Sequence, residues 1–290
     1  MSGGRVRRGW LLIPVVVSLL SAPAYAQSGE GSGIEWQEGP TTGQLGEIAR
    51  IQVPEGYRFT GRDGVRRFME LTQNPVSGDE LGVLVSPGDD NWFVIFEFNP
   101  IGYVKDDEKG DLDANAILAS LKKGNERGNE ERRKRGWATL DLLGWSTPPR
   151  YDPVTNNLTW AIRGSSEGTE VVNHSVRLLG RRGVMDADLV LGPGQVGSAV
   201  PEFDRLLTGF EFVSGNRYAE WVKGDKVAAY GLTALVAGGV GAAAAKSGLL
   251  GKLWKVLVFG AIAVAASAKR LLASLFGSKD ARPEASASAQ

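Results

Sequence analysis

The sequence predicts an α+β fold, mostly antiparallel, with one long helix, several short helices and transmembrane helices at its carboxyl end. Two observations lead to this class. Short runs with strand periodicity lie on both sides of one long helical run, which favours α+β over a series of β-α-β units. The last quarter of the chain then contains two uncharged apolar runs, 227–245 and 256–268, after a body of mixed polarity.

Before the long helix, the chain is expected to form two hairpins. Residues 47–53 alternate apolar and polar side chains, break at a Pro-Glu-Gly sequence and resume at 57–60, which predicts the first hairpin. The apolar runs 81–85 and 92–98 are joined by a Pro-Gly-Asp-Asp-Asn sequence. Each of those residues tolerates turn dihedrals, so the second pair is also expected to be a hairpin.

A short helix is expected between these hairpins, over residues 64–71. Asp63 is suited to cap its first turn, and Val65, Phe68 and Leu71 follow at helical spacing. The long helix is expected over 113–135. Its first half carries an apolar face, whereas its second half is crowded with charges, so we expect the first half to dock and the second to face water.

Strand patterns return after the long helix. Strands are expected at 138–143, 158–163, 170–179, 183–191 and 210–213, and a short helix at 200–207 with Pro201 in its first turn. The aromatic and Pro-rich stretch between the first two strands is expected to be a loop. Its aromatic side chains have two readings, core packing or a groove for a peptide or glycan: Trp137, Trp145, Trp160 and Tyr151.

The two ends of the chain predict export and anchoring. Three arginines precede an apolar run and an Ala-Tyr-Ala sequence ending at Ala26, the pattern of a cleaved signal peptide over 1–26. Residues 27–33 are Gly/Ser-rich and predict a flexible leader, so the exported domain is expected to span 34–225.

The tail that follows is expected to be a membrane anchor over 226–270. At 1.5 Å per residue, segment 227–245 is about 28 Å long, close to the roughly 30 Å of a bilayer core. Ala234, Gly238 and Gly241 are small residues suited to close helix packing in the membrane. The second segment, 249–268, either spans as the other arm of a hairpin or lies at the interface, and 271–290 is expected to be disordered.

Composition limits the chemistry. The chain has 33 basic and 33 acidic residues, and the signal removes three arginines, so the body carries about 30 − 33 = −3 charges and no footprint for nucleic acid. There is no cysteine and one histidine, which excludes disulfides, thiolate metal sites and Cys nucleophiles. We therefore expect no cofactor and no metal, and any acid/base chemistry would rest on carboxylates.

Three short sequences match the consensus of a functional motif, but each is better explained as an ordinary turn or helix start. The G-x-S-x-G match at 164–168 lacks the strand-to-helix context of a nucleophile elbow and predicts a hairpin loop. The G-x-G-x-x-G match at 192–197 comes late in the chain and predicts a turn feeding a helix. The acids near 106–113 do not follow the EF-hand register, so a solvated turn and helix start is favoured there.

Segments distributed along the mature chain resemble a known family. They include Val53-Pro54-Glu55-Gly56-Tyr57, Gly102-Tyr103-Val104, Gly136-Trp137, Gly144-Trp145, Tyr151-Asp152, Leu158-Thr159-Trp160-Ala161, the run from Arg177 to Val184, Tyr218 and the run from Gly224 to Gly231. In this order they are similar to the bacterial DUF2167 proteins, membrane-anchored proteins of unknown function. The resemblance implies a cleaved signal and carboxyl-terminal membrane segments, and it implies no reaction.

The resulting expectation is a non-enzymatic binding or interaction module on the bacterial inner membrane, with its main domain facing the periplasm. Its expected partners are the lipid bilayer and either a second copy or another envelope protein. The alternative is a carboxylate-dependent envelope hydrolase. Its candidate catalytic residues are Asp106, Asp107, Glu108 and Asp152.

Overall fold

The computed structural model describes residues 33–237 apart from 73, 75, 89–91 and 111. They form two antiparallel sheets, one of eight strands in the order β1-β4-β5-β6-β10-β9-β8-β7 and one of three in the order β11-β3-β2. The large sheet contains β1 (Gln37–Glu38), β4 (Arg58–Gly61), β5 (Glu80–Val85), β6 (Phe93–Asn99), β7 (Asp141–Asp152), β8 (Asn157–Ser166), β9 (Thr169–Leu179) and β10 (Val184–Leu191). The small sheet contains β2 (Thr41–Leu45), β3 (Ala49–Val53) and β11 (Phe210–Phe212).

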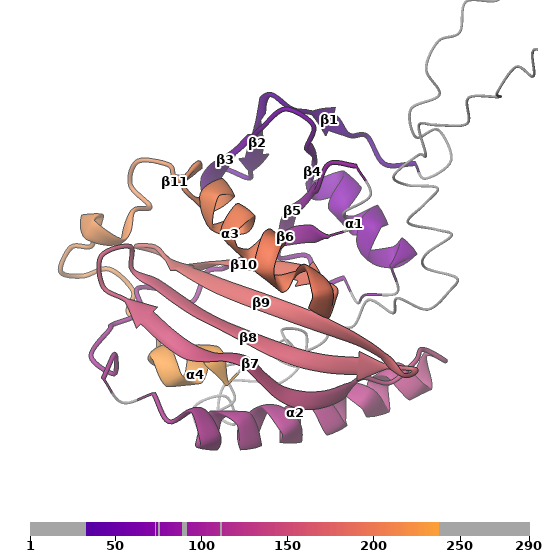
Figure 1. The fold of residues 1–290 in the computed structure, drawn as a ribbon. Helices are drawn as coiled ribbons and strands as arrows, with labels where there is room; N and C mark the ends of the chain where they lie inside the picture. The colour runs from indigo at the N-terminus through magenta and orange to yellow at the C-terminus, as the bar shows by residue number, and fades with distance from the viewer. Residues whose placement is uncertain (1–32, 73, 75, 89–91, 111, 238–290) are drawn as a thin grey trace, which may run out of the picture.

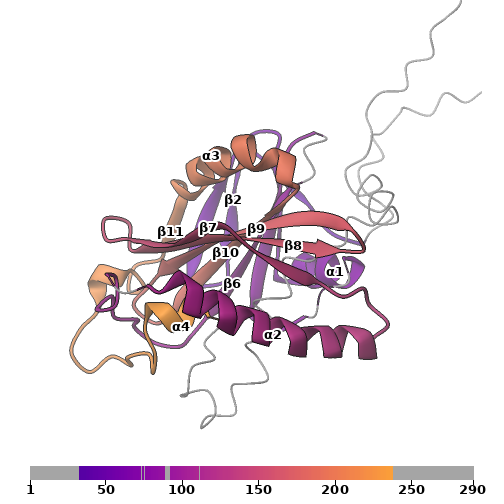
Figure 2. The same cartoon turned by 60° about the horizontal axis from the view of Figure 1, so that its bottom comes forward.

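Helices cover both faces of the large sheet (Figures 1 and 2). On one face lies α3 (Val196–Leu207), which follows the 3-10 turn η1 (Pro193–Gln195). On the other face lie α1 (Arg62–Leu71), α2 (Ala114–Lys134) and α4 (Leu232–Val236), the last preceded by the 3-10 turn η2 (Tyr218–Glu220). The predicted α+β class with a mostly antiparallel sheet is therefore confirmed.

Strand β10 shows how the sheet separates these two faces. Met185, Ala187 and Leu189 belong to the apolar cluster that contains α3 residues, whereas Val184 and Val190 point to the opposite face. This is the alternation that a strand pleat imposes on a sheet buried from both sides. The opposite face holds two separate apolar clusters, one under α1 and one under α2 and α4.

The first predicted hairpin is wrong, although both of its strands exist. Strand β3 pairs with β2 and β11 in the small sheet, whereas β4 pairs with β1 and β5 in the large one. The turn between β3 and β4 therefore carries the chain from one sheet to the other. β2 and β11 pair with the two sides of β3, so β4 cannot pair with it, and β2 has no clear strand pattern in the sequence. The hairpins around 164–168 and between β9 and β10 form as expected, and 192–197 is a turn feeding α3.

The start of α1 also differs from the prediction. The helix begins at Arg62 with Gly61, which has no side chain to cap it, as its N-cap residue. Asp63 therefore lies inside the first turn, where its negative charge still complements the helix dipole. Val65 and Phe68 are buried as expected, and so is Met69.

The aromatic and Pro-rich stretch is part of a strand, not a loop. Strand β7 runs from Asp141 to Asp152 and includes Pro148 and Pro149, with register shifts on either side of Thr147. Proline lacks the N–H that an interior strand must donate, and β7 tolerates it because it is the edge strand with β8 as its sole partner in the sheet. The Trp145 indole donates a hydrogen bond to the Ala114 carbonyl at 3.0 Å, so this aromatic side chain serves packing.

The second half of α2 also docks, through one face of the helix, although most of its charged side chains face water as expected. Gly124 and Gly128 lie on the buried face of this half. Asn125 and Asn129 each donate to the Leu140 carbonyl, at 2.7 and 2.6 Å, and Asn129 accepts from the Leu140 N–H at 2.8 Å. The periodicity of apolar residues could not predict this contact because amide side chains make it. The N-terminus was predicted correctly, since Asp113 accepts hydrogen bonds from the N–H groups of Asn115 and Ala116.

The predicted helical span starting at residue 227 needs correction. Val227 forms a parallel β-bridge with Tyr103, and helix α4 begins only at Leu232. Leu232, Leu235 and Val236 are buried in the cluster beneath the large sheet, so this part of the tail belongs to the domain. Ala234 lies half-buried in α4.

The remaining terminal predictions concern residues that the structure does not describe. The signal peptide, the leader up to residue 32 and residues 238–290, with Gly238 and Gly241 among them, lie outside the described residues. Within the part that is described, none of the helices has both the length and the hydropathy that crossing a bilayer requires.

Docking of α4 can be tested by shortening its central side chain. Leu232 has 0% exposure, so Leu232→Ala removes buried apolar atoms and is expected to lower the free energy of unfolding by about 2–4 kcal/mol. The measurement is denaturant unfolding of the full chain in mild detergent, followed by tryptophan fluorescence. Leu143→Ala on the exposed edge strand is the matched control and should cost less than about 1 kcal/mol. Equal small effects of both substitutions would contradict the docked position.

Candidate functional site

A row of ionisable side chains crosses four neighbouring strands of the large sheet. Glu80 on β5 is the register partner of Glu97 on β6, Glu97 is the partner of Asp186 on β10, and Asp186 is the partner of Arg177 on β9. Residues directly opposite one another in an antiparallel sheet share a face, so these side chains form one continuous line. The line runs between the apolar cluster under α1 and the cluster under α2 and α4.

Arg177 joins the acids of this row. Its Nε lies 3.0 Å from Oδ1 of Asp186 and its Nη1 lies 3.0 Å from Oδ1 of Asp188. Asn99 donates to Asp186 at 2.7 Å, and the Ser175 hydroxyl donates to Asp188. The guanidinium also lies over the Trp160 ring, 4.7 Å from its centroid. One fixed cation thus pairs with two carboxyl groups inside the fold.

Burial shifts the protonation of this cluster. It raises the pKa of Asp186 to about 7, against the lowering effect of Arg177. It also raises the pKa of Glu97 well above its ordinary value, and the neighbouring charges of Asp186 and Glu80 add to this. Burial by itself lowers the pKa of a guanidinium, but Asp186 and Asp188 outweigh it and raise the pKa of Arg177.

Two atoms of the cluster have no hydrogen-bond partner within the described part of the chain: Oε2 of Glu97 and Nη2 of Arg177. The Glu80 carboxylate is by contrast satisfied by Ser77 and by the Gly78 N–H, with contacts of 2.6–2.7 Å. Among the described residues no group of three metal-ligating side chains is placed to share a metal ion. The cluster is therefore a closed ionic element within the core, since Glu97, Arg177, Asp186 and Asp188 are all at most 5% exposed.

A second polar and aromatic assembly lies at one end of the sheet, around the segment that follows β11, orange at the left of Figure 1. The Tyr103 ring stacks on Tyr218 with centroids 4.4 Å apart, and Trp221 lies 5.3 Å from Tyr103. Burial and the nearby Asp106 raise the pKa of Tyr151 to about 12. We call the outer surface of residues 213–227, together with Tyr103, the 213–227 face.

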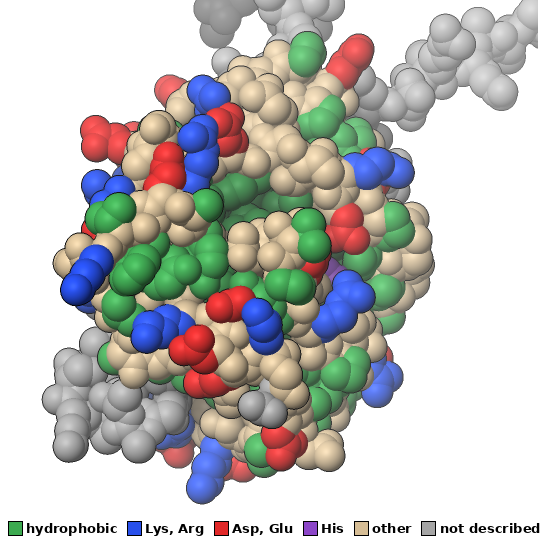
Figure 3. Space-filling view, turned by 90° about the vertical axis from the view of Figure 1, so that its left-hand side faces the viewer, with side chains coloured by type: hydrophobic (Ala, Val, Ile, Leu, Met, Phe, Trp, Pro, Cys, Tyr) green, Lys and Arg blue, Asp and Glu red, His purple; other side chains and the backbone are tan. Residues whose placement is uncertain are grey.

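This face exposes apolar side chains. Val213, Trp221, Val222 and Val227 are 37–52% exposed. Figure 3 looks at this side of the molecule and shows hydrophobic side chains gathered in and around a hollow, with acidic and basic side chains around them. Exposed apolar side chains that gather at one place indicate a contact surface.

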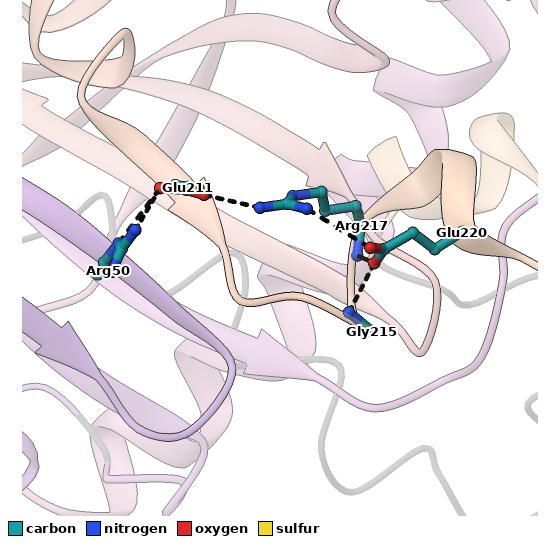
Figure 4. Close-up of polar contacts among 5 residues, drawn as sticks. All are labelled: Arg50, Glu211, Gly215, Arg217 and Glu220. Carbon is teal, nitrogen blue, oxygen red and sulfur yellow. Dashed lines mark hydrogen bonds and ion pairs between the residues drawn. The ribbon is translucent and has the colours of Figure 1, made fainter.

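Ion pairs hold the 213–227 segment against the small sheet (Figure 4). Glu211 on β11 accepts from Arg50 at 2.8 Å and from Arg217 at 2.8 Å. Glu220 accepts from the N–H groups of Gly215 and Arg217 at 2.7 and 2.8 Å. Because these groups are largely exposed, each pair contributes little stability, but together they fix the path of the segment.

A bidentate ion pair holds the carboxyl-terminal part of the same segment in place. Arg181 donates to both carboxylate oxygens of Asp225, at 2.7 and 2.9 Å, and this contact lowers the pKa of Asp225 to about 2. Backbone hydrogen bonds from Tyr103 to Lys226 and from Ala228 to Tyr103, both 2.8 Å, join the segment to the loop after β6.

The structure places three of the four predicted catalytic carboxylates in local contacts and leaves the fourth exposed. Asp106 pairs with Lys109 at 3.2 Å, and Asp107 is exposed. Glu108 accepts the Thr233 N–H at 2.9 Å and so holds the first turn of α4. Asp152 accepts from Val154 and Thr155 in the β7–β8 turn, which lowers its pKa.

The sole histidine lies on the other face of the sheet. The His174 ring meets the Phe203 ring of α3 edge-on at 5.9 Å, and burial lowers the pKa of His174. Its Nε2 has no hydrogen-bond partner among the residues that the structure describes. It is a packed strand residue, as its position in an apolar strand predicts.

Comparison with known proteins gives one decisive match. The family described as "Protein of unknown function (DUF2167)" matches residues 37–268, most of the chain. The chain belongs to the DUF2167 family. No curated protein matches this member.

Two solved structures show distant similarity to this DUF2167 protein. Cyanobacterial PsbP (CyanoP) from Synechocystis sp. PCC 6803 has 14% sequence identity and a TM-score of 0.36, covering 66% of this chain and 100% of that one. A protein of unknown function, PA94, from Pseudomonas aeruginosa has 12% identity and a TM-score of 0.23, covering 57% of this chain and 91% of its own. At these values neither similarity conveys a substrate or a partner.

The buried cluster escaped prediction, although its signal was present in the sequence. Strand β10 places Asp186 and Asp188 two residues apart in an otherwise apolar run, and β9 places Arg177 at a position of the same kind. Charges at core-facing positions of a strand demand partners of opposite sign. The partners could be identified only once the strand register was known.

The protonation of Glu97 predicts an unusual pH dependence. Its folded-state pKa is raised, so the folded protein holds this proton where the unfolded chain has lost it, and stability falls as pH rises above about 4.5. Asp186 adds to this fall between about pH 4 and its folded value near 7. The free energy of unfolding is therefore expected to fall between pH 5 and pH 8.

Glu97→Gln keeps the shape of the neutral side chain and removes its titration. The variant should be at least as stable as the parent at pH 8, and its loss of stability from pH 5 to pH 8 should be smaller by more than about 1 kcal/mol. Urea unfolding at the two pH values measures this. Glu126→Gln on the exposed side of α2 is the matched control. A slope identical to that of the parent would show that Glu97 is ionised in the fold.

Proposed function

We propose that this DUF2167 protein is a non-enzymatic interaction module of the bacterial cell envelope, exported by its N-terminal signal and held at the inner membrane by its tail. The 213–227 face is its contact surface. The observation that carries this proposal is the distribution of polar groups. The only concentrated carboxylates with raised pKa values in the described structure are sealed in the core, whereas exposed apolar side chains gather on the 213–227 face.

The hydrolase alternative has less support. General acid/base catalysis needs a carboxyl group within reach of substrate and with a pKa suited to its task. Asp106, Glu108 and Asp152 instead hold a loop, the start of α4 and a turn. Asp186 has a suitable pKa but is 3% exposed and bound to Arg177, so no substrate atom could approach it in this conformation.

The docked position of α4 bears on how the tail could anchor the protein. Between the end of the described chain and Lys246 only eight residues remain, 238–245, about 12 Å of helix and far less than a bilayer core. Segment 249–268 has 20 residues and a length of about 30 Å. We therefore propose a single span through 249–268 with α4 kept in the domain, in place of a two-arm hairpin.

This topology agrees with the distribution of charge. A domain in the periplasm and one span place Lys269, Arg270, Lys279 and Arg282 in the cytoplasm, as the positive-inside rule favours. Lys252 and Lys255 lie near the outer end of the span, where their amines can reach the headgroups.

Fractionation and protease accessibility in cells test the anchor. The full chain, carrying a C-terminal epitope, should stay with the membranes through a carbonate wash. Protease added to intact spheroplasts should digest the domain and leave the epitope protected, because it is cytoplasmic. A cytoplasmic reporter protein and a periplasmic one serve as controls. Release by carbonate would refute the tether, and digestion of the epitope in sealed spheroplasts would refute the single span.

A further inference from the structure

We infer that the 213–227 face rests on the anionic surface of the bilayer to which the tail leads. This inference rests on the membrane anchor proposed above. It identifies the partner of the 213–227 face as lipid headgroups and not another protein.

The apolar part of the face is built as a rigid projection. Trp221 and Val222 are 37% and 52% exposed, yet the Val222 N–H donates to Asp225 at 2.9 Å and the Trp221 ring leans on Tyr103. A tryptophan held half in water, with an apolar body and one N–H donor, is suited to the headgroup region of a membrane. Insertion of these side chains would thus require little further ordering of the segment.

The charge of the face is positive, in contrast to the body as a whole. The segments that build it, 103–106, 180–183 and 211–227, contain six cations and four acids, an excess of 6 − 4 = 2. All four acids are engaged: Asp225 pairs with Arg181, Glu211 and Glu220 pair with Arg217, and Asp106 pairs with Lys109 outside these segments. The remaining cations make no ion pair among the described residues: Lys105, Arg182, Lys223 and Lys226. Such unpaired cations beside exposed apolar groups attract anionic headgroups.

The position of the face relative to the tail supports the same occupant. Val227 is bridged to Tyr103 within the face, and α4 starts five residues later, fixed by the bond from Thr233 to Glu108. The apolar tail therefore leaves the domain from the same end that presents Trp221 and the lysines. A domain tethered here would hold this end close to the bilayer.

A second copy of the chain is a poorer occupant. A two-fold dimer would bring the same face of both copies together, and two surfaces that each carry four cations without an ion pair among the described residues would repel. A stable protein complex buries roughly 800 Å² of each partner. The four exposed apolar side chains of this face, Val213, Trp221, Val222 and Val227, are few for an interface of that size.

The chain has no cysteine, so one introduced thiol can report on this contact without background. Val222→Cys, labelled with the environment-sensitive fluorophore NBD, is reconstituted as the full chain in phosphatidylcholine vesicles with and without 30% phosphatidylglycerol. Arg66→Cys is the matched control, because Arg66 is exposed and belongs to α1, which lies on the side of the domain opposite to the 213–227 segment (Figure 1). The readouts are the NBD emission wavelength and its quenching by brominated lipid.

The label at position 222 is expected to shift to shorter wavelength and to be quenched in anionic vesicles, while the label at position 66 stays aqueous. Lys223→Glu with Lys226→Glu should weaken the contact at least 25-fold, at about fivefold per lysine, and raised salt should weaken it as well. Lys122→Glu with Lys123→Glu on the exposed side of α2 is the charge-matched control.

The outcomes distinguish a failure of lipid contact by the 213–227 face from a failure of the membrane anchor. If the chain floats with vesicles and the label at 222 stays aqueous in both lipids, the face does not meet lipid and this inference falls, while the tether stands. If the chain does not float with vesicles at all, the tether itself fails. A label that is buried equally with and without anionic lipid, but is not quenched by brominated lipid, would identify a protein contact instead.

Discussion

Arg177 is the charge on which the arrangement of the large sheet depends. Its guanidinium binds Asp186 and Asp188 at 3.0 Å each, and these strands could not otherwise turn two carboxylates into the interior. The pairing creates a polar strip between two apolar clusters on one face of the sheet. One cluster receives α1 and the other receives α2 and α4, so the strip divides the helices into two docking areas.

The same cluster shows why buried charge does not imply catalysis. Raised pKa values at Glu97 and Asp186 are a frequent mark of active sites, but structural ionic networks produce them too. Here Asp186 is paired with Arg177 and hydrogen-bonded by Asn99, and both Glu97 and Asp186 are closed off from solvent. The position of the cluster between packed helices, and not its titration, indicates a role in specifying the fold.

The sequence predicted most elements of the fold and few of its contacts. The strands around residues 158–191 and the cap at Asp113 follow from periodicity and local hydrogen bonding, and the structure confirms them. The pairing of β3 with β2, and the docking of α2 through Asn125 and Asn129, depend on partners distant in sequence. Hydrophobicity alone predicted that the residues of α4 belong to a membrane-spanning helix. A short apolar helix packed on a core and the start of a membrane span have the same composition, so the sequence does not distinguish them.

The candidate site was still harder to predict. Asp106 and Glu108 attract attention as clustered acids and Asp152 as an acid beside aromatic residues, yet each serves local structure. The residues of the 213–227 face are unremarkable as a linear sequence. They become a surface only because Tyr103, Arg181 and Glu211, from three other parts of the chain, hold the segment in place.

The central claim is that the domain extends through α4 and presents the 213–227 face at the point where the tail departs. Hydrogen–deuterium exchange of the full chain, compared between mild detergent and anionic lipid nanodiscs, tests it most directly. We expect the amides of 232–236 to be protected in both, and those of 213–227 to gain protection in nanodiscs. Fast exchange at 232–236 in detergent, or unchanged exchange at 213–227 on transfer to lipid, would contradict the account.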